Sequence, residues 1–323
     1  MRAIRDAGGD VASVCAALDL APEIEHHADT VIALEQLQAL YDEAAQLTGD
    51  PSFGLHLATN FPRGTYGIVE FIARSSATVR EGWERIAELS RVMSPQVSVT
   101  ITERTGEVSF DHAIPGRPLV YGRHGNEFFV PAVLLQTRGL IGPDFVPTRA
   151  WFAHPAHDQV DELARTLGTT QITFSAGSNG VALPKALLDR PVPSADPPLL
   201  STLTHAATRA LETDPPARSF VEMVRADVGS RMEGGAATLE ATAQAFHMSP
   251  RTLQRRLGDE GTTFANIVDA VREELARAWV AEGKLGLGEV TFRLGYADVP
   301  AFVRAFKRWT KMTPTSYRER SKG

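Results

Sequence analysis

The sequence predicts two domains: an α+β domain in residues 1–200, and an all-α domain in residues 218–323 that contains two helix-turn-helix units joined by a long helix. Three observations predict this fold class. Helical and strand-like patterns mix irregularly in the first part, Pro-rich breaks follow it, and one pattern of apolar and capping residues then occurs twice. At 323 residues the chain is long enough for two separate cores.

The first 190 residues show no regular βαβ repeat. Cys15 lies in the apolar stretch VASVCAALDL, which is typical of a packed helix. Thr78 followed by Glu81 is a capping box, and it predicts the start of a helix. Trp83, Phe128 and Trp151 are expected in the core rather than around a pocket. The predicted helices cover 33–47, 66–74, 78–93 and about 122–140, and the predicted strands lie at 97–101, at 108–110, around Trp151 and at 172–174.

The boundary between the domains is predicted within 191–217, where RPVPSADPP and ETDPPARS flank a helical stretch at 199–211. We therefore expect a linker region at 201–217. Charge changes sign across this boundary. From Pro216 onward 17 Lys and Arg stand against 13 Asp and Glu, a balance of +4, whereas the rest of the chain holds 16 against 26, or −10. A basic C-terminal part beside an acidic N-terminal part suits a DNA-binding domain coupled to another function.

The repeated pattern predicts two helix-turn-helix units, at 238–258 and 287–308. Each copy has three residues at i, i+4 and i+7, which share one helix face, and then a capping residue that opens a second helix. The second helix of such a unit lies in the DNA major groove. The first copy is Leu239, Ala243, Phe246, Ser249, Leu253 and Leu257, and the second is Leu287, Thr291, Leu294, Asp298, Phe302 and Phe306.

Between the two units, an apolar stripe predicts the connecting helix. The second helix of each unit is called its recognition helix. Gly261 stands where the first recognition helix must end, and Gly readily adopts the left-handed conformation of a C-cap. The stripe consists of Phe264, Ile267, Val268, Val271 and Leu275.

The first recognition helix is predicted to read bases through Arg251, Gln254 and Arg255, which project opposite Leu253 and Leu257. Arg bonds guanine bidentately and Gln bonds adenine. Arg256 is expected to contact phosphate. In the second helix the corresponding base reader is Arg304, with Lys307 and Arg308 expected on phosphates.

The second unit departs from the first at Pro300 and Val303, whose side chains cannot donate hydrogen bonds. Pro300 also disfavours helical geometry at Val299, so we expect this helix to start one residue late. We therefore expect the second unit to anchor the protein more than it specifies sequence.

Two segments, MSPRTLQRRLGDEGTTF at 248–264 and FVRAFKRWTKMTPTSYR at 302–318, resemble the DNA-binding domain of AraC/XylS-type transcriptional regulators over roughly 218–320. The resemblance implies two helix-turn-helix units that read successive major grooves, with Arg251, Gln254 and Arg255 at base-contacting positions. Thr291 and Lys311 depart from the small residue and the capping Gly that are usual in the family.

The N-terminal part is similar to the domain labelled arabinose-binding in one branch of these regulators. LTGDPSFGLHL at 47–57 and SSATVREGW at 75–83 carry this resemblance, and Asp50 and Gly54 in the first segment are expected to form a turn. The label does not establish arabinose as the ligand, and the ligand-binding residues are left open.

Several classes of protein are disfavoured. Cys15 is the single cysteine, so no disulfide within the chain or Cys-based zinc site is expected, and a reducing cytoplasm is the natural compartment. His154 and His157 flank Pro155 and lie off any clear helix, so we expect no metal there. No cofactor motif and no apolar run of 18 residues occurs, and no membrane span is expected.

We therefore predict a sequence-specific transcription regulator that responds to a small-molecule effector and has no catalytic activity. Its expected partners are double-stranded promoter DNA, the effector, a second copy of the chain, and RNA polymerase as the partner of an activator. The alternative is an enzyme, either a DNA-repair alkyl-transfer protein or an amidotransferase-like module, fused to the same DNA-binding domain. Such an enzyme needs a nucleophilic Cys, and Cys15 lies in an apolar stretch without nearby His, Lys or Arg.

Overall fold

The computed structural model describes residues 1–6, 8–21, 24, 32–60, 62–94, 96–117, 119–213, 219–232 and 236–320. These residues form two compact units. The first unit consists of Met1–Arg85, Ile101–Phe110 and Val120–Leu203, and the second of Ile86–Thr100, Asp111–Leu119 and Thr204–Gly323. Two short segments on either side of a β-hairpin therefore belong with the C-terminal helices.

The predicted helices before residue 200 are present, each within about two residues of its expected bounds. Four further helices, α1, α4, α8 and α9, are short, at five, seven, eight and four residues. The helices are α1 (Arg2–Asp6), α2 (Val11–Ala17), α3 (Leu34–Thr48), α4 (Phe53–Thr59), α5 (Gly67–Ser75), α6 (Val79–Met93), α7 (Gly122–Ile141), α8 (Val160–Leu167), α9 (Lys185–Leu188) and α10 (Pro197–Thr213). Helix α10 contains the described part of the predicted linker, whose residues 214–217 lie outside the described residues.

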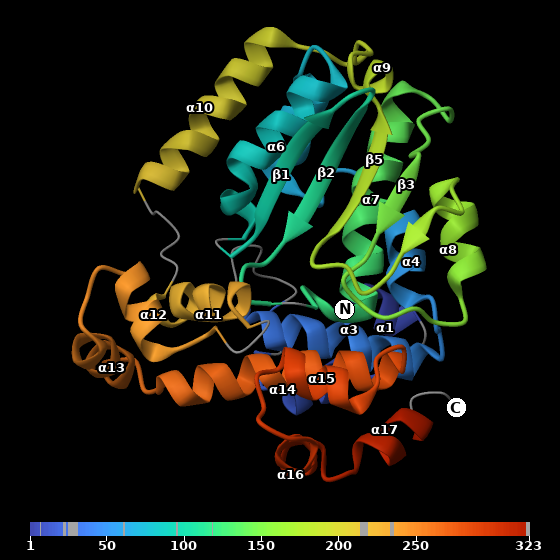
Figure 1. Cartoon of the computed structure of the whole chain (residues 1–323). Helices are drawn as coiled ribbons and strands as arrows, with labels where there is room; N and C mark the ends of the chain where they lie inside the picture. Colours follow the sequence, from blue (N-terminus) through green and yellow to red (C-terminus); the bar gives the residue numbers. More distant parts are fainter. Residues whose placement is uncertain are drawn as a thin grey trace. The chain divides into compact units, whose positions relative to one another are not determined.

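A five-stranded sheet forms the centre of the α+β fold, with strand order β1-β2-β5-β3-β4 (Figure 1). Strand β3 pairs in parallel with β4, with Ala150 opposite Ile172, and antiparallel with β5, with Ala150 opposite Val181. The sheet is therefore mixed. The strands are β1 (Ser98–Arg104), β2 (Glu107–Ala113), β3 (Arg149–Trp151), β4 (Ile172–Thr173) and β5 (Asn179–Pro184).

Strand β5, which the sequence did not predict, is the middle strand of this sheet. Its first five residues are all buried, so it shows no alternation of apolar and polar side chains. A strand covered on both faces loses the period of two on which strand prediction depends.

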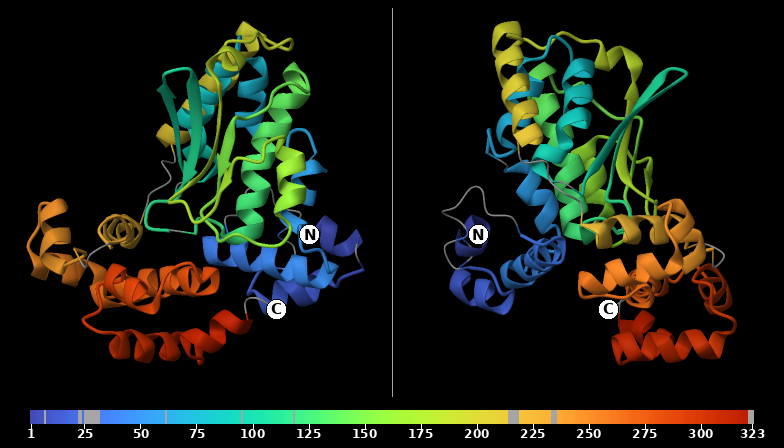
Figure 2. Two further views of the ribbon diagram at one scale, coloured as in Figure 1. Left: turned by 45° about the vertical axis from the view of Figure 1, so that its right-hand side comes forward. Right: turned by 90° about the vertical axis from the view of Figure 1, so that its left-hand side faces the viewer.

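The three aromatic residues Trp83, Phe128 and Trp151 are buried in the core, as expected, at 2%, 8% and 9% exposure. The Trp83 ring packs edge-on against Phe110 and Phe145, with ring centroids 5.1 and 5.9 Å apart. Helix α7 contacts β5 on one side and α4 on the other. Figure 2 shows this long green helix beside the sheet.

The expected turn at Asp50 and Gly54 is confirmed for Asp50 and wrong for Gly54. Asp50 does form a turn, in which its carboxylate accepts the Ser52 N–H at 2.9 Å. Gly54, however, lies inside α4. A Cβ at Gly54 would come within 1.9 Å of the His124 carbonyl oxygen on α7. Gly54 is therefore explained by the close approach of two helices, and not by the conformational freedom of a turn.

The C-terminal helices pack around two separate cores, one for each helix-turn-helix unit. Helix α14 runs through both, and Leu275 contacts both. Among the described residues, no helix is long and apolar enough to cross a membrane. The helices are α11 (Phe220–Ser230), α12 (Leu239–Ala245), α13 (Pro250–Asp259), α14 (Phe264–Glu282), α15 (Leu287–Arg293), α16 (Val299–Thr310) and α17 (Pro314–Arg320).

Candidate nucleic-acid interface

The first helix-turn-helix unit consists of α12 and α13, as the repeat predicted. The Ser249 hydroxyl caps α13 by accepting the Thr252 N–H at 3.1 Å. Pro250 takes the first helical position, where its missing N–H leaves no donor unsatisfied. Thr238 caps α12 in the same way, accepting the Ala241 N–H at 3.1 Å.

The two faces of α13 differ as a recognition helix requires. Leu253 and Leu257 are fully buried in the core of the first unit. Arg251, Gln254 and Arg255 are exposed on the opposite side. The helix thus presents one amide and two guanidinium groups to solvent from a rigid, capped element.

The second unit consists of α15 and α16, and the Asp298 carboxylate caps α16 by accepting the Ala301 N–H at 2.7 Å. Our expectation that this helix starts late was wrong, because its first residue is Val299. Pro300 lies in the first turn, where backbone N–H groups have no partner within the helix, so its ring removes no hydrogen bond. Val303 is partly buried against the core, while Arg304 is exposed.

The tight turns of the two units use the same backbone conformation at equivalent positions. His247 has φ +52° and Gly295 has φ +69°. Only the second turn has the residue that favours this left-handed region. The first unit therefore holds a strained His at its turn.

The connecting helix α14 buries the predicted stripe. Ile267, Val268 and Val271 are 4%, 8% and 0% exposed. Gly261 has the expected left-handed conformation, at φ +76°, but it follows the C-cap residue of α13, which is Glu260 at φ −93°. Lys311 caps α16 in the left-handed region, at φ +60°.

Thr291 replaces a small residue without leaving a polar group unsatisfied. It is 4% exposed, and its hydroxyl donates to the Leu287 carbonyl oxygen at 2.6 Å. The equivalent Ala243 in the first unit is 1% exposed. The first helix of each helix-turn-helix unit is thus closely packed at this position.

Most cations of this part of the chain are engaged within the protein. Arg272 of α14 donates to the Leu294 carbonyl oxygen at 2.8 Å, and Arg318 donates to Val280 and Leu285. Others form ion pairs with carboxylates or lie over aromatic rings. The engaged cations include Arg225, Arg231, Arg256, Arg272, Arg277, Lys284, Arg293, Arg308, Lys311, Arg318 and Arg320.

Four cations within 219–320 make no hydrogen bond, ion pair or ring contact with any residue that the structure describes: Arg251, Arg255, Arg304 and Lys307. All four are exposed, two on α13 and two on α16. In the described part of this domain, the cations without an internal partner are thus concentrated on the two recognition helices.

Two predicted phosphate-contacting residues have internal partners. The Arg256 guanidinium lies 4.0 Å from the centroid of the Phe220 ring, a cation–π contact. Arg308 forms an ion pair with Asp269 of α14 at 2.5 Å. Sequence reasoning missed both partners, since Phe220 and Asp269 are more than thirty residues away in the chain.

Another network that the sequence did not reveal supports the first unit. The Asp227 carboxylate of α11 accepts hydrogen bonds from the Thr242 hydroxyl at 2.7 Å and from Arg231 at 2.8 Å. Thr242 is fully buried in α12, so this bond satisfies a buried hydroxyl. In the sequence, the one sign of this network is that Thr242 interrupts an otherwise apolar helix face, since a buried hydroxyl needs a hydrogen-bond partner.

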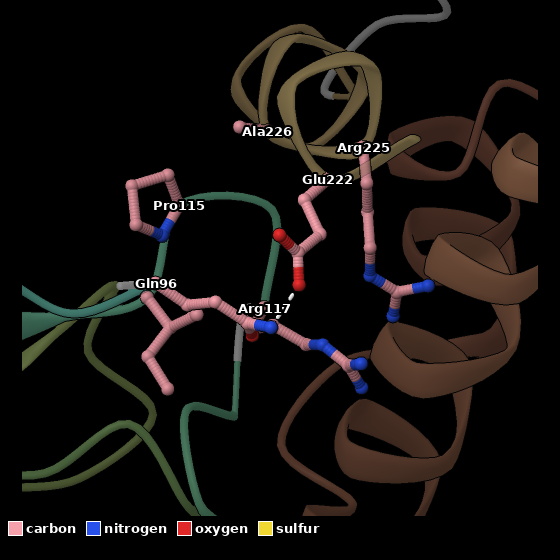
Figure 3. A pocket seen from close by; sticks show the side chains of 7 residues that line it. Gln96, Pro115, Arg117, Glu222, Arg225 and Ala226 are labelled. Atoms are coloured by element: carbon pink, nitrogen blue, oxygen red, sulfur yellow. Dashed lines mark hydrogen bonds between the residues drawn. The ribbon is translucent and has the colours of Figure 1, made fainter. Parts of the chain in front are cut away.

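A small pocket in the second compact unit, the one that contains the C-terminal helices, lies where the segment 111–119 meets α11 (Figure 3). Gln96 donates to the Glu222 carboxylate inside it. Burial and the nearby Arg225 lower the pKa of Arg117. Its lining residues are Gln96, Ile114, Pro115, Arg117, Glu222, Arg225 and Ala226.

Main-chain groups of the same segment contact α11 and α14, two helices of the second compact unit. Arg225 of α11 donates to the Gly116 carbonyl oxygen at 3.1 Å and to Glu274 of α14 at 2.8 Å. Glu274 in turn accepts the Leu119 N–H at 3.2 Å. A Cβ at Gly229 would lie 2.7 Å from the Gly116 Cα, so the two backbones are in direct contact.

Comparisons with known proteins agree with this geometry. The family profile described as "Arabinose-binding domain of AraC transcription regulator, N-term" matches residues 8–192. The profile described as "Helix-turn-helix domain" matches residues 242–320.

The chain is similar to the HTH-type transcriptional regulator VirS of Mycobacterium tuberculosis (strain CDC 1551 / Oshkosh), with 30% identity over 98% of this chain and 92% of that one. It is 25% identical to the Ornithine utilization regulator of Pseudomonas aeruginosa, covering 92% of this chain and 87% of the relative. Among solved structures, the transcriptional regulator CdpR of Pseudomonas aeruginosa is 21% identical over 96% of both chains, with a TM-score of 0.42.

These matches decide between a regulator and a fused enzyme. The first profile covers more than half of the chain, and the relatives that align along its length are regulators. Cys15, the nucleophile that the enzyme alternative needs, is fully buried in α2. The chain is a member of the AraC family of transcription regulators, with an arabinose-binding-type N-terminal domain and a helix-turn-helix DNA-binding domain.

Proposed function

We propose that this regulator binds specific promoter sequences in the cytoplasm through α13 and α16, in response to a small-molecule effector. Arg251, Gln254, Arg255 and Arg304 are the proposed base readers. The observation that carries the proposal is that, among the described residues of 219–320, the four cations without an internal partner all lie on the two recognition helices. An unpaired Arg on a capped helix binds guanine without first breaking an internal contact.

The proposed phosphate contacts fall into two groups. Lys307 has no partner among the described residues and can neutralise a phosphate directly. Arg256 and Arg308 must exchange their partners Phe220 and Asp269 for phosphate oxygens. The Asp269 carboxylate is 41% exposed, so the release of Arg308 costs little, whereas Arg256 must leave the ring of the buried Phe220 and uncover apolar surface.

Effector response requires a physical link between the sensor and the DNA-binding helices. The segment 111–119 can supply one, since it contains the end of β2, precedes α7 and packs on α11 and α14 within the second compact unit. An effector that shifts β2 or α7 would therefore move a segment bonded to Arg225 and Glu274. One relative, at 25% identity, is named an ornithine utilization regulator, which is consistent with response to a small metabolite.

We propose further that residues 1–200 dimerise and that the bound protein contacts RNA polymerase. A single domain with few unpaired cations gains little affinity from phosphate contacts at cellular salt. Linking two such domains makes the second binding event intramolecular and raises the overall affinity by orders of magnitude.

The DNA-binding proposal is tested with a site obtained by genomic footprinting of the purified full-length protein. Arg255→Ala should weaken binding to that site by about 1–3 kcal/mol while binding to random duplex changes little. Arg104→Ala, which removes the same charge from an exposed position of β1, is the matched control and should leave both affinities unchanged. Equal losses on specific and random DNA would show that Arg255 contacts phosphate instead.

Dimerisation is tested by light scattering of the full-length protein and by its binding to one half-site or to two in tandem. We expect a dimer that prefers tandem sites strongly. A monomer that binds single and tandem sites with equal affinity would refute this part of the proposal.

A further inference from the structure

A buried carboxylate and two imidazoles meet in the first compact unit, which contains the N-terminal helices and none of the DNA-binding helices. Glu127 comes from α7, and His154 and His157 follow β3. Their side chains are 1%, 2% and 10% exposed. One potential ligand atom of each residue lies within 4.8 Å of the other two.

The contacts within this cluster are crowded. The Nε2 atom of His154 lies 3.1 Å from Oε1 of Glu127, and Nε2 of His157 lies 2.5 Å from the same oxygen. The second distance is shorter than the roughly 2.7 Å of a normal N–H···O bond. This His157 nitrogen and Nδ1 of His154 are both buried, and neither makes a hydrogen bond with the described residues.

Aromatic side chains shield the cluster from water. The Phe174 ring lies edge-on to both imidazoles, with centroids 5.5 and 5.7 Å away, and Phe152 lies 5.3 Å from His154. An apolar shell of this kind strengthens the binding of a cation to its ligands.

We propose that Glu127, His154 and His157 form a binding site for one divalent transition-metal ion of the zinc type, with its remaining coordination position open to water or another small donor. Two imidazoles and one carboxylate are a ligand set that suits Zn²⁺. Mg²⁺ and Ca²⁺ prefer oxygen ligands alone and are disfavoured.

The geometry needs only a small adjustment to hold the ion. Tetrahedral Zn²⁺ with bonds of about 2.0–2.1 Å separates its ligand atoms by roughly 3.3 Å. The two observed distances from Oε1 of Glu127, 3.1 and 2.5 Å, must therefore increase by less than about 1 Å. His157 is the least buried of the three residues and can supply this movement.

Metal binding is also linked to the start of α8. The Gln159 N–H donates to Nδ1 of His157 at 3.1 Å, so in the metal-free protein the imidazole proton resides on Nε2. Coordination through Nε2 transfers this proton to Nδ1, and the Gln159 N–H must then turn away. Gln159 immediately precedes α8, so the ion should alter the first turn of that helix.

A neighbouring cation does not exclude the ion. Arg123 lies 3.4 Å from Oε1 of Glu127, and it also donates to the Pro51 carbonyl oxygen at 2.6 Å and to the Gln159 amide oxygen at 2.8 Å. These partners can hold the guanidinium when the carboxylate turns to a metal.

The sequence argued against a metal at His154 and His157, because Pro155 lies between them and no helix aligns them. Only the tertiary structure brings Glu127 to the pair, from 27 residues earlier in the chain. The proposal does not depend on the proposed DNA contacts or on the nature of the effector.

The test uses untagged full-length protein that has been stripped with a chelator and then dialysed against Zn²⁺ or Co²⁺ alone. We expect about one tightly bound ion per chain by elemental mass spectrometry, and visible absorption bands of four- or five-coordinate Co²⁺. His157→Gln should lower the affinity at least tenfold. His205→Asn, which removes an exposed imidazole from α10, is the matched control and should not change it.

Because Glu127 is buried, Glu127→Gln serves as a second variant, with its folding checked by circular dichroism in the absence of metal. It should keep the fold and lose the ion. Substoichiometric binding by the wild-type protein, or equal loss of metal in His157→Gln and His205→Asn, would overturn the proposal and leave the cluster as a hydrogen-bonded network.

Discussion

Asp269 of α14 holds Arg308 of α16: one guanidinium nitrogen of Arg308 donates to both carboxylate oxygens of Asp269, at 2.5 and 2.7 Å. The Trp309 indole N–H also donates to Asp269, at 2.9 Å. The connecting helix thus controls a cation on the second recognition helix. The Arg308 side chain is 60% exposed, so solvent screens the ion pair and its contribution to stability is small.

Asp269→Asn should release Arg308 for phosphate contact. We expect tighter binding to random duplex DNA at low salt, and a salt dependence of log K that is steeper by about 0.9, the value for one added phosphate contact on B-DNA. Fluorescence anisotropy over a salt series measures both quantities. Asp269→Asn combined with Arg308→Ala is the control and should lose the gain; a gain that persists in the double variant would assign it to the lost Asp charge alone.

The two recognition helices should contribute unequally to sequence specificity. Pro300 and Val303 cannot donate hydrogen bonds where Arg251 and Gln254 can, and Val303 is partly buried as well. Base-pair substitutions under α13 should therefore weaken binding more than substitutions one helical turn away, under α16. Affinities for a set of singly substituted sites measure this. Comparable penalties in both half-sites would mean that DNA shape or apolar contacts make the second unit specific.

Because the C-cap residue of α16, Lys311, has a left-handed backbone conformation, we predict that replacing it with Gly increases the stability of the protein. Lys311 has φ +60°, a region in which a Cβ is unfavourable, so Lys311→Gly should stabilise the protein by about 1 kcal/mol. Thermal unfolding of the full-length chain is the measurement. Gly261→Ala is the reverse control, since Gly261 has φ +76° in open space. It should destabilise by a similar amount; a change of the same sign in both variants would refute the strain argument.

The link between α4 and α8 should depend on pH. His56 bonds Glu162 and Asp50 through its two ring nitrogens, each at 2.8 Å. The hydrogen bonds to Glu162 and then to Asp50 raise the pKa of His56 above its ordinary value. A raised pKa in the folded state means that the stabilisation is fully present below the unfolded pKa of about 6.5 and is lost as the pH rises through the folded pKa.

His56→Gln should therefore lower the urea midpoint of unfolding more at pH 5.5 than at pH 8.5. Glu162 does not interfere in this window: hydrogen bonds from Ser52 and then from His56 hold its pKa below the ordinary value, so its stabilisation is lost only at a pH below the window. An equal effect at both pH values would show that the His56 contacts do not depend on its charge.

Sequence reasoning succeeded where structure is set by residues close in the chain. Ser249 and Asp298 cap their helices through the N–H groups three residues later, and Gly261 has the backbone conformation expected of it. It failed where distant parts of the chain meet. Strand β5 has no alternating pattern because it is buried on both faces, and Gly54 is explained only by the His124 carbonyl oxygen on α7.

The candidate DNA interface was found from spacing, because a helix of period 3.6 assigns each residue to a face before any tertiary contact forms. The two helix-turn-helix units and the residues on their outer faces therefore follow from local spacing. Which cations have an internal partner depends on contacts between helices that are distant in the chain. Arg304 and Arg308 lie one helical turn apart, yet Arg304 has no partner among the described residues and Arg308 is held by Asp269, 39 residues away. An ion pair depends on where two helices cross, and no local pattern encodes that crossing.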